Sequence, residues 1–138
     1  MIGKLNFNVL LKLREKDIFS SFSRMVMESA AEDKEEALRR IMAREGLGAT
    51  AIGDDLPVPH AKVPGLKEPS VVIGVADEPL DYDGKAVRII VMMLLPEDGS
   101  SSDVGLLPSL VSAVSSESGR ERVLSAATAK EVEEVFLP

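Results

Sequence analysis

The unbroken apolar run Ile89–Leu95 constrains the fold more than any other segment of this sequence. The run is far too short to cross a bilayer, which takes about 20 residues. It is typical of a β-strand buried on both faces, and such a strand needs helices on both sides of its sheet. A second apolar strand is expected over Ser70–Ala76, with a turn at Tyr82–Lys85 between the two. The run therefore predicts the centre of a helix-covered sheet and no membrane insertion.

Hydrophobic periodicity adds one strand and two helices before these strands. Leu5–Leu13 alternates loosely between apolar and other residues, which predicts a strand. Apolar positions at helical spacing predict an amphipathic helix over Lys16–Ala30 and another from Asp33 to about Arg44. Asp33 also precedes Glu36 by three residues, which is the spacing of a capping pair.

The C-terminal part predicts three more helices. Apolar residues from Val104 to Val114 recur on one stripe, and Pro108 suits a first helical turn. Ser118 and Thr128 each precede a glutamate by three residues, which predicts two further helix starts. About four strands and five helices are expected in all. We therefore predict an α/β fold, a three-layer α/β/α sandwich with a mixed sheet flanked by helices.

Composition excludes several classes of function. No repeat or long linker divides the chain, so residues 1–138 are expected to form a single domain. The net charge of −7 argues against a nucleic-acid surface. The absence of cysteine and the single histidine exclude thiolate catalysis and a multi-histidine metal site, so no metal or other cofactor is expected. The N-terminus lacks the pattern of a signal peptide, which indicates a cytoplasmic location.

The stretch Gly46–Gly65 is dense in glycine and proline and indicates a connection or a functional loop. Within it, His60 is the one side chain able to act as a nitrogen nucleophile near neutral pH. A lone histidine is more often a residue without a role. However, Pro57 and Pro59 stiffen the backbone before His60, and Lys62 would face the same side of a strand. These neighbours favour a functional histidine.

Arg44 and Thr50 precede this histidine, and each has two interpretations. Arg44 either complements the negative end of a helix dipole or clamps an anion with its planar guanidinium. Thr50 is either an ordinary strand residue or a hydroxyl donor to a phosphate oxygen. Together with His60 and glycine N–H groups, they are the parts that histidine phosphorylation requires.

The segment Arg44–Lys62 as a whole resembles a known active site. Its Arg-Glu pair, its Ala-Thr pair and its Pro-His-Ala-Lys ending resemble the active-site segment of the IIA domains of the bacterial phosphoenolpyruvate:sugar phosphotransferase system. The resemblance is to the fructose/mannitol type, which includes the nitrogen-regulatory IIA proteins, and it extends over nearly the whole chain.

This resemblance implies a phosphoryl carrier with a three-layer fold. Nε2 of His60 would accept phosphate from the small protein HPr, with Arg44 close by, and no metal or nucleotide would be needed. The phosphate would pass to a IIB domain or remain as a regulatory mark, so the chain would be a component of a phosphotransferase rather than a complete enzyme. We expect the docking patch around the histidine to include Leu47, Leu56 and Val58.

Two departures from the family pattern keep other functions open. Asp103 stands where the family commonly has a second histidine, and Asp55–Val58 replaces a Gly-Ile-Ala-Ile stretch. A carboxylate at Asp103 would orient the imidazole of His60 and repel a phosphoryl group. One alternative is therefore a divergent IIA-like regulatory or protein-binding module that is not an efficient phosphocarrier. Another is a hydrolase that pairs His60 with Asp103 or Asp55.

Overall fold

The computed structural model describes residues 4–53, 55–98 and 105–138. Within these ranges lie six strands and five helices. In chain order they are β1 (Asn6–Leu13), α1 (Ile18–Met27), α2 (Lys34–Glu45), β2 (Ala51–Ile52), β3 (Leu56–Pro57), β4 (His60–Val63), β5 (Ser70–Tyr82), β6 (Lys85–Pro96), α3 (Leu106–Ala113), α4 (Glu117–Leu124) and α5 (Ala129–Phe136).

Four strands form one mixed sheet in the order β1-β5-β6-β4. β1 runs parallel to β5 and β4 runs parallel to β6, whereas β5 and β6 are antiparallel. The β5–β6 hairpin turns at Asp83 and Gly84, whose φ angles are 52° and 83°. Two successive left-handed residues are what a tight hairpin turn needs, and Asp-Gly is well suited to it. The expected mixed sheet is therefore confirmed, and its edge strand β4 begins at His60.

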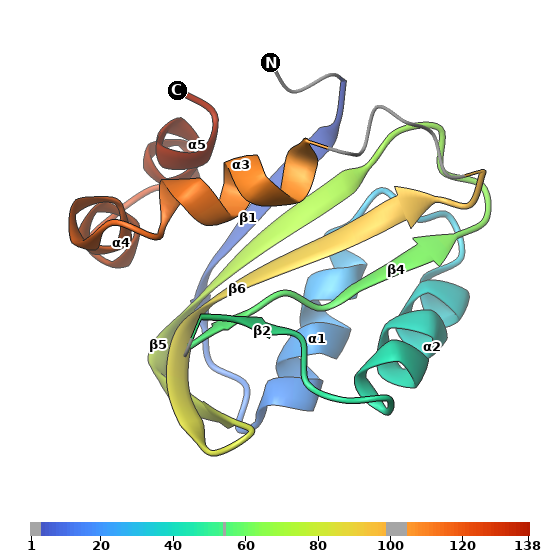
Figure 1. The fold of residues 1–138 in the computed structure, drawn as a ribbon, viewed down its shortest axis with the longest axis horizontal. Coiled ribbons are helices and arrows are strands. Elements are labelled where there is room, and N and C mark those ends of the chain that lie inside the picture. Colours follow the sequence, from blue (N-terminus) through green and yellow to red (C-terminus); the bar gives the residue numbers. More distant parts are fainter. Residues whose placement is uncertain (1–3, 54, 99–104) are drawn as a thin grey trace.

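Helices cover both faces of this sheet, which confirms the three-layer prediction. Figure 1 shows α1 and α2 on one face and α3, α4 and α5 on the other. Successive residues of β6 alternate between two apolar clusters: Ile90 and Met92 pack with α1 and α2, and Ile89 and Val91 pack with the C-terminal helices. The run is apolar throughout because both of its faces are buried.

The helix starts agree with the sequence at two of three predicted caps. Asp33 accepts a hydrogen bond from the Glu36 N–H at 3.0 Å, and the Thr128 hydroxyl accepts one from the Glu131 N–H at 3.2 Å. The predicted start at Ser118 is wrong. The residue that caps α4 is Ser116, whose backbone is extended and whose Oγ accepts from the Gly119 N–H at 3.0 Å.

Gly119 lies in the first turn of α4, against the chain that leaves α3. A Cβ atom at Gly119 would lie only 2.0 Å from the main-chain oxygen of Ala113. The chain leaving α3 therefore crosses the first turn of α4 so closely that only glycine fits.

Gly119→Ala is accordingly expected to lower the free energy of unfolding by about 2–3 kcal/mol, because backbone must move to relieve the overlap. Urea denaturation measures this change. Gly46→Ala is the matched control, since its Cβ would meet ordinary contacts of 3.4 and 3.5 Å and its φ of −64° suits any residue. Equal stability of the two variants would contradict the close approach.

Candidate functional site

His60 is the first residue of β4, and its side chain is half-buried. In the parallel register with β6 it pairs with Met93, which packs in the cluster under α3, α4 and α5. Paired residues of adjacent strands share a face of the sheet. The imidazole therefore lies on the face that carries the C-terminal helices, and β4 is the edge strand of the sheet (Figure 1).

One hydrogen bond sets the chemistry of this imidazole. Nδ1 of His60 lies 2.8 Å from the carbonyl oxygen of Val58, which can only accept. In the neutral ring Nδ1 therefore carries the proton, and the lone pair is on Nε2. The acceptor is well held, because Val58 is buried and its own N–H donates to the Thr50 carbonyl at 3.0 Å. The local backbone thus presents Nε2 as the nucleophilic atom.

Arg44 reaches the same end of β4 as His60. Helix α2 runs antiparallel to β4, since Glu32 before the helix approaches Gly65 after the strand, and Arg40 donates to the Lys62 carbonyl at 3.1 Å. Arg44 is one helical turn beyond Arg40, about 6 Å, and His60 is two strand residues before Lys62, about 7 Å.

The side chains of Arg44 and His60 are bonded to different carbonyl groups, however. The Arg44 guanidinium donates to the carbonyl of Gly48 at 3.3 Å. This bond closes the loop that leaves α2. The placement of Arg44 near the phosphate of a phosphorylated His60 stays a prediction.

Thr50 belongs to a hydrogen-bonded network that the sequence did not reveal. Its hydroxyl donates to Glu45 Oε2 at 2.6 Å, the Tyr82 hydroxyl donates to Glu45 Oε1 at 2.7 Å, and the Thr50 N–H donates to the Tyr82 oxygen at 2.7 Å. Thr50 and Tyr82 are both buried. Burial raises the pKa of Tyr82, and the neighbouring Glu45 carboxylate raises it further. The phenol therefore stays protonated near neutral pH and remains a donor.

The network changes the interpretation of Thr50. Its hydroxyl donates its proton to Glu45 of α2, and its backbone N–H donates to Tyr82 of the β5–β6 hairpin. Thr50 therefore joins α2 to the hairpin. Glu45 carried a sequence signal through its place beside Arg44 in the motif. Tyr82 carried none beyond its position in a turn, because it meets Thr50 only through the tertiary fold.

The predicted apolar patch is wrong for two of its three members. Leu56 and Val58 are only 3% and 1% exposed, because they pack into the cluster under the C-terminal helices. Leu47 is 83% exposed, as expected, and Ile52 joins it at 39%. The exposed apolar side chains of this loop are therefore Leu47 and Ile52. Asp103, the fourth predicted site residue, lies outside the described residues.

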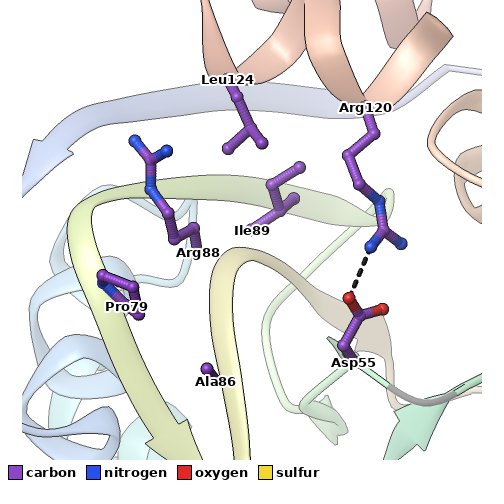
Figure 2. Close-up of a pocket in the computed structure, with 7 residues that line it drawn as sticks. All are labelled: Asp55, Pro79, Ala86, Arg88, Ile89, Arg120 and Leu124. Carbon is purple, nitrogen blue, oxygen red and sulfur yellow. Dashed lines mark hydrogen bonds and ion pairs between the residues drawn. The ribbon is translucent and has the colours of Figure 1, made fainter. Parts of the chain in front are cut away.

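Asp55 is held by α4. Its Oδ2 accepts from the Arg120 guanidinium at 2.5 Å, beside a cavity of about 200 Å³ (Figure 2). Arg88 also lines the cavity, and its Nε donates to the Ala76 carbonyl at 2.9 Å. The ion pair connects the β2–β3 loop to a helix 65 residues away. Arg120 gave no signal in the sequence.

Two kinds of feature are absent from residues 4–53, 55–98 and 105–138. No three side chains of the types His, Cys, Asp and Glu gather there as metal ligands would. No helix in those ranges is long and apolar enough to cross a membrane.

Comparison with known proteins gives a family match over most of the chain. The family model described as "Phosphoenolpyruvate-dependent sugar phosphotransferase system, EIIA 2" matches residues 6–137. The chain is 29% identical over 133 residues to the PTS system 2-O-alpha-mannosyl-D-glycerate-specific EIIABC component of Escherichia coli K12. That alignment covers 93% of this chain and 20% of the relative, so the chain spans about a fifth of that protein's length.

Solved structures share the fold. The nitrogen regulatory protein IIA-Ntr from Neisseria meningitidis has a TM-score of 0.80 at 26% identity, and the match covers 94% of this chain and 92% of that one. The complex of enzyme IIAMtl with phosphorylated enzyme IIBMtl from Escherichia coli gives 0.73 at 16% identity, with 94% and 93% covered. The second likeness concerns the fold alone.

Proposed function

Because this chain belongs to the EIIA 2 family of the phosphoenolpyruvate-dependent sugar phosphotransferase system, we propose that it is a phosphoryl carrier whose acceptor is His60. The observation that carries the proposal is the 2.8 Å contact between His60 Nδ1 and the Val58 carbonyl. That contact leaves the lone pair on Nε2, which is the form of imidazole that can attack phosphorus.

The proposed transfer forms one nitrogen–phosphorus bond and breaks another. The Nε2 lone pair forms a bond to the phosphorus of phosphorylated HPr, while the bond from that phosphorus to the HPr imidazole breaks. The HPr imidazole carries a proton on its other ring nitrogen, keeps the electron pair of the broken bond and leaves as neutral imidazole. The new phosphoimidazole of His60 still carries a proton on Nδ1, and the Val58 carbonyl accepts it. A fixed carbonyl dipole thus stabilises the positive charge that develops on the ring.

We propose two kinds of partner for the His60 face. HPr would donate the phosphate, and a IIB domain would receive it; the complex of IIAMtl with phosphorylated IIBMtl supports the second partner through its shared fold. Leu47 and Ile52 would supply the apolar part of the docking surface. Two exposed apolar side chains suit the brief contact that a carrier must make and release.

A regulatory role is the second candidate. The likeness to the nitrogen regulatory protein of Neisseria meningitidis favours it, since that match extends over 94% of the chain. Phosphate on His60 would then act as a mark that a regulated protein detects. A hydrolase that pairs His60 with Asp55 is disfavoured, because Arg120 binds Asp55 and Val58 occupies Nδ1.

A phosphate-transfer assay tests the carrier function. Incubation of the chain with labelled phosphoenolpyruvate, enzyme I and HPr should place about one phosphate on each chain, and the label should be lost in acid, as expected for a phosphoimidazole. A reaction without HPr is the control and should give no label. A chain that stays unlabelled beside an active HPr would refute the carrier function and favour a binding module.

A further inference from the structure

Three hydrogen bonds connect Tyr82 to His60. The Tyr82 hydroxyl oxygen accepts from the Thr50 N–H at 2.7 Å. The Thr50 carbonyl accepts from the Val58 N–H at 3.0 Å, and the Val58 carbonyl accepts from His60 Nδ1 at 2.8 Å. The phenol of the β5–β6 hairpin therefore lies at one end of a continuous path whose other end is the imidazole.

The Tyr82 hydroxyl is itself fixed in position and direction. Its proton goes to Glu45 Oε1 at 2.7 Å, so its lone pairs face the Thr50 N–H. Its ring packs edge-on against Phe22, with 6.2 Å between the ring centroids. The side chain is 4% exposed, which leaves little access for water to replace the hydroxyl.

The β2–β3 ribbon that precedes His60 is too short to hold its own conformation. Strands β2 and β3 have two residues each and pair only through Ala51 with Pro57 and Ile52 with Leu56. A ribbon of this length is not stable alone, and Pro57 has no N–H to donate. Contacts from outside the ribbon therefore hold it. Val58 is buried under the C-terminal helices, the Met93 N–H donates to the Pro59 carbonyl at 3.0 Å, and the Tyr82 hydroxyl fixes Thr50 at the other end.

We propose that Tyr82 is a positioning residue for phosphoryl transfer, and that its hydroxyl, through the backbones of Thr50 and Val58, holds His60 in the tautomer with Nε2 free. The inference rests on the proposed function of His60 as the phosphoryl acceptor. Removal of the hydroxyl leaves the buried Thr50 N–H without an acceptor. Thr50 then shifts to find one, and the Val58 carbonyl moves with it. Nδ1 loses its fixed acceptor, and both tautomers become populated.

The test compares Tyr82→Phe with Phe22→Leu. Tyr82→Phe removes one oxygen atom and keeps the ring. Phe22→Leu is the matched control, because it disturbs the same aromatic contact and Phe22 is a partner in none of the three hydrogen bonds of the path. Two readouts are taken for each: the nitrogen-15 spectrum of the imidazole above about pH 8, where an ordinary histidine is neutral, and the rate of transfer from phosphorylated HPr. The single histidine makes the spectrum unambiguous.

We expect the parent and Phe22→Leu to show one tautomer, protonated on Nδ1. Tyr82→Phe should show a mixture of tautomers and should transfer phosphate about tenfold more slowly, since loss of a fixed orientation costs at least that much. A single tautomer in Tyr82→Phe would overturn the inference. Mixed tautomers and slow transfer in both variants would also overturn it, because the effect would then be general loosening. A parent chain that takes no phosphate would refute the carrier function, and the spectra would still decide whether Tyr82 positions the ring.

Discussion

His60→Asn is expected to take up no phosphate from phosphorylated HPr, while it keeps the fold of the parent chain. The chain has a single histidine, so no second imidazole can replace the lost nucleophile. An asparagine amide has no basic lone pair on nitrogen and cannot attack phosphorus. Labelling with radioactive phosphoenolpyruvate, enzyme I and HPr measures the loss, which should be complete.

The fold of this variant is checked by circular dichroism and by its melting temperature. His60 is half-buried at the start of an edge strand, and its side chain is hydrogen-bonded to the Val58 carbonyl, which the asparagine N–H₂ group can also bind. We therefore expect a stability close to that of the parent. Labelling that persists in His60→Asn would move the acceptor to another residue and refute the proposed function.

Arg44→Ala is expected to slow transfer by about two to three orders of magnitude. Charge develops on the phosphoryl oxygens in the transition state, and a charge-assisted contact made mainly there is worth a few kcal/mol. Arg44 sits at the level of His60 along β4, and its bond to the Gly48 carbonyl is long, at 3.3 Å, so we predict that the guanidinium leaves this carbonyl to bind the phosphate. Rapid-quench measurement of transfer from phosphorylated HPr gives the rate.

Two further variants test whether this loss of transfer rate comes from a contact between Arg44 and the phosphate. Arg40→Ala removes the same charge one turn earlier on α2, where the guanidinium binds Glu36 and Glu97, and it should transfer phosphate at the parent rate. Arg44→Lys should recover only part of the rate, since an ammonium lacks the planar fork of donors. If Arg44→Ala transfers normally but melts earlier than the parent, Arg44 acts on the helix dipole and not on the phosphate.

Several features followed from residues that are close together in the sequence. The apolar run predicted a strand covered on both faces, because seven successive apolar side chains leave no face for water. The Asp83-Gly84 turn and the Asp33 and Thr128 caps were predictable for a similar reason, since each depends on backbone angles and hydrogen bonds within about four residues. The proposed acceptor, His60, was also visible through its proline neighbours and its resemblance to a known motif.

Other features depend on contacts between segments that are far apart in the sequence. The extent of β5 beyond Ala76 depends on its pairing with β6, and the need for glycine at position 119 depends on the close approach of Ala113. Leu56 and Val58 looked like a docking surface, but helices that come some 50 residues later cover them.

The sequence by itself therefore determined which residue is the candidate nucleophile, and the tertiary structure decided what holds its ring in place. His60 was identifiable because nucleophilicity belongs to a residue type and its immediate neighbours, whereas Nε2 was indicated by the family resemblance and then by the bond from Nδ1 to the Val58 carbonyl. The supports were not identifiable: Tyr82 reaches Thr50 across 32 residues and Arg120 reaches Asp55 across 65. A hydrogen bond between such residues leaves no periodic pattern in the chain, because its geometry exists only after the sheet and its two helical layers have packed.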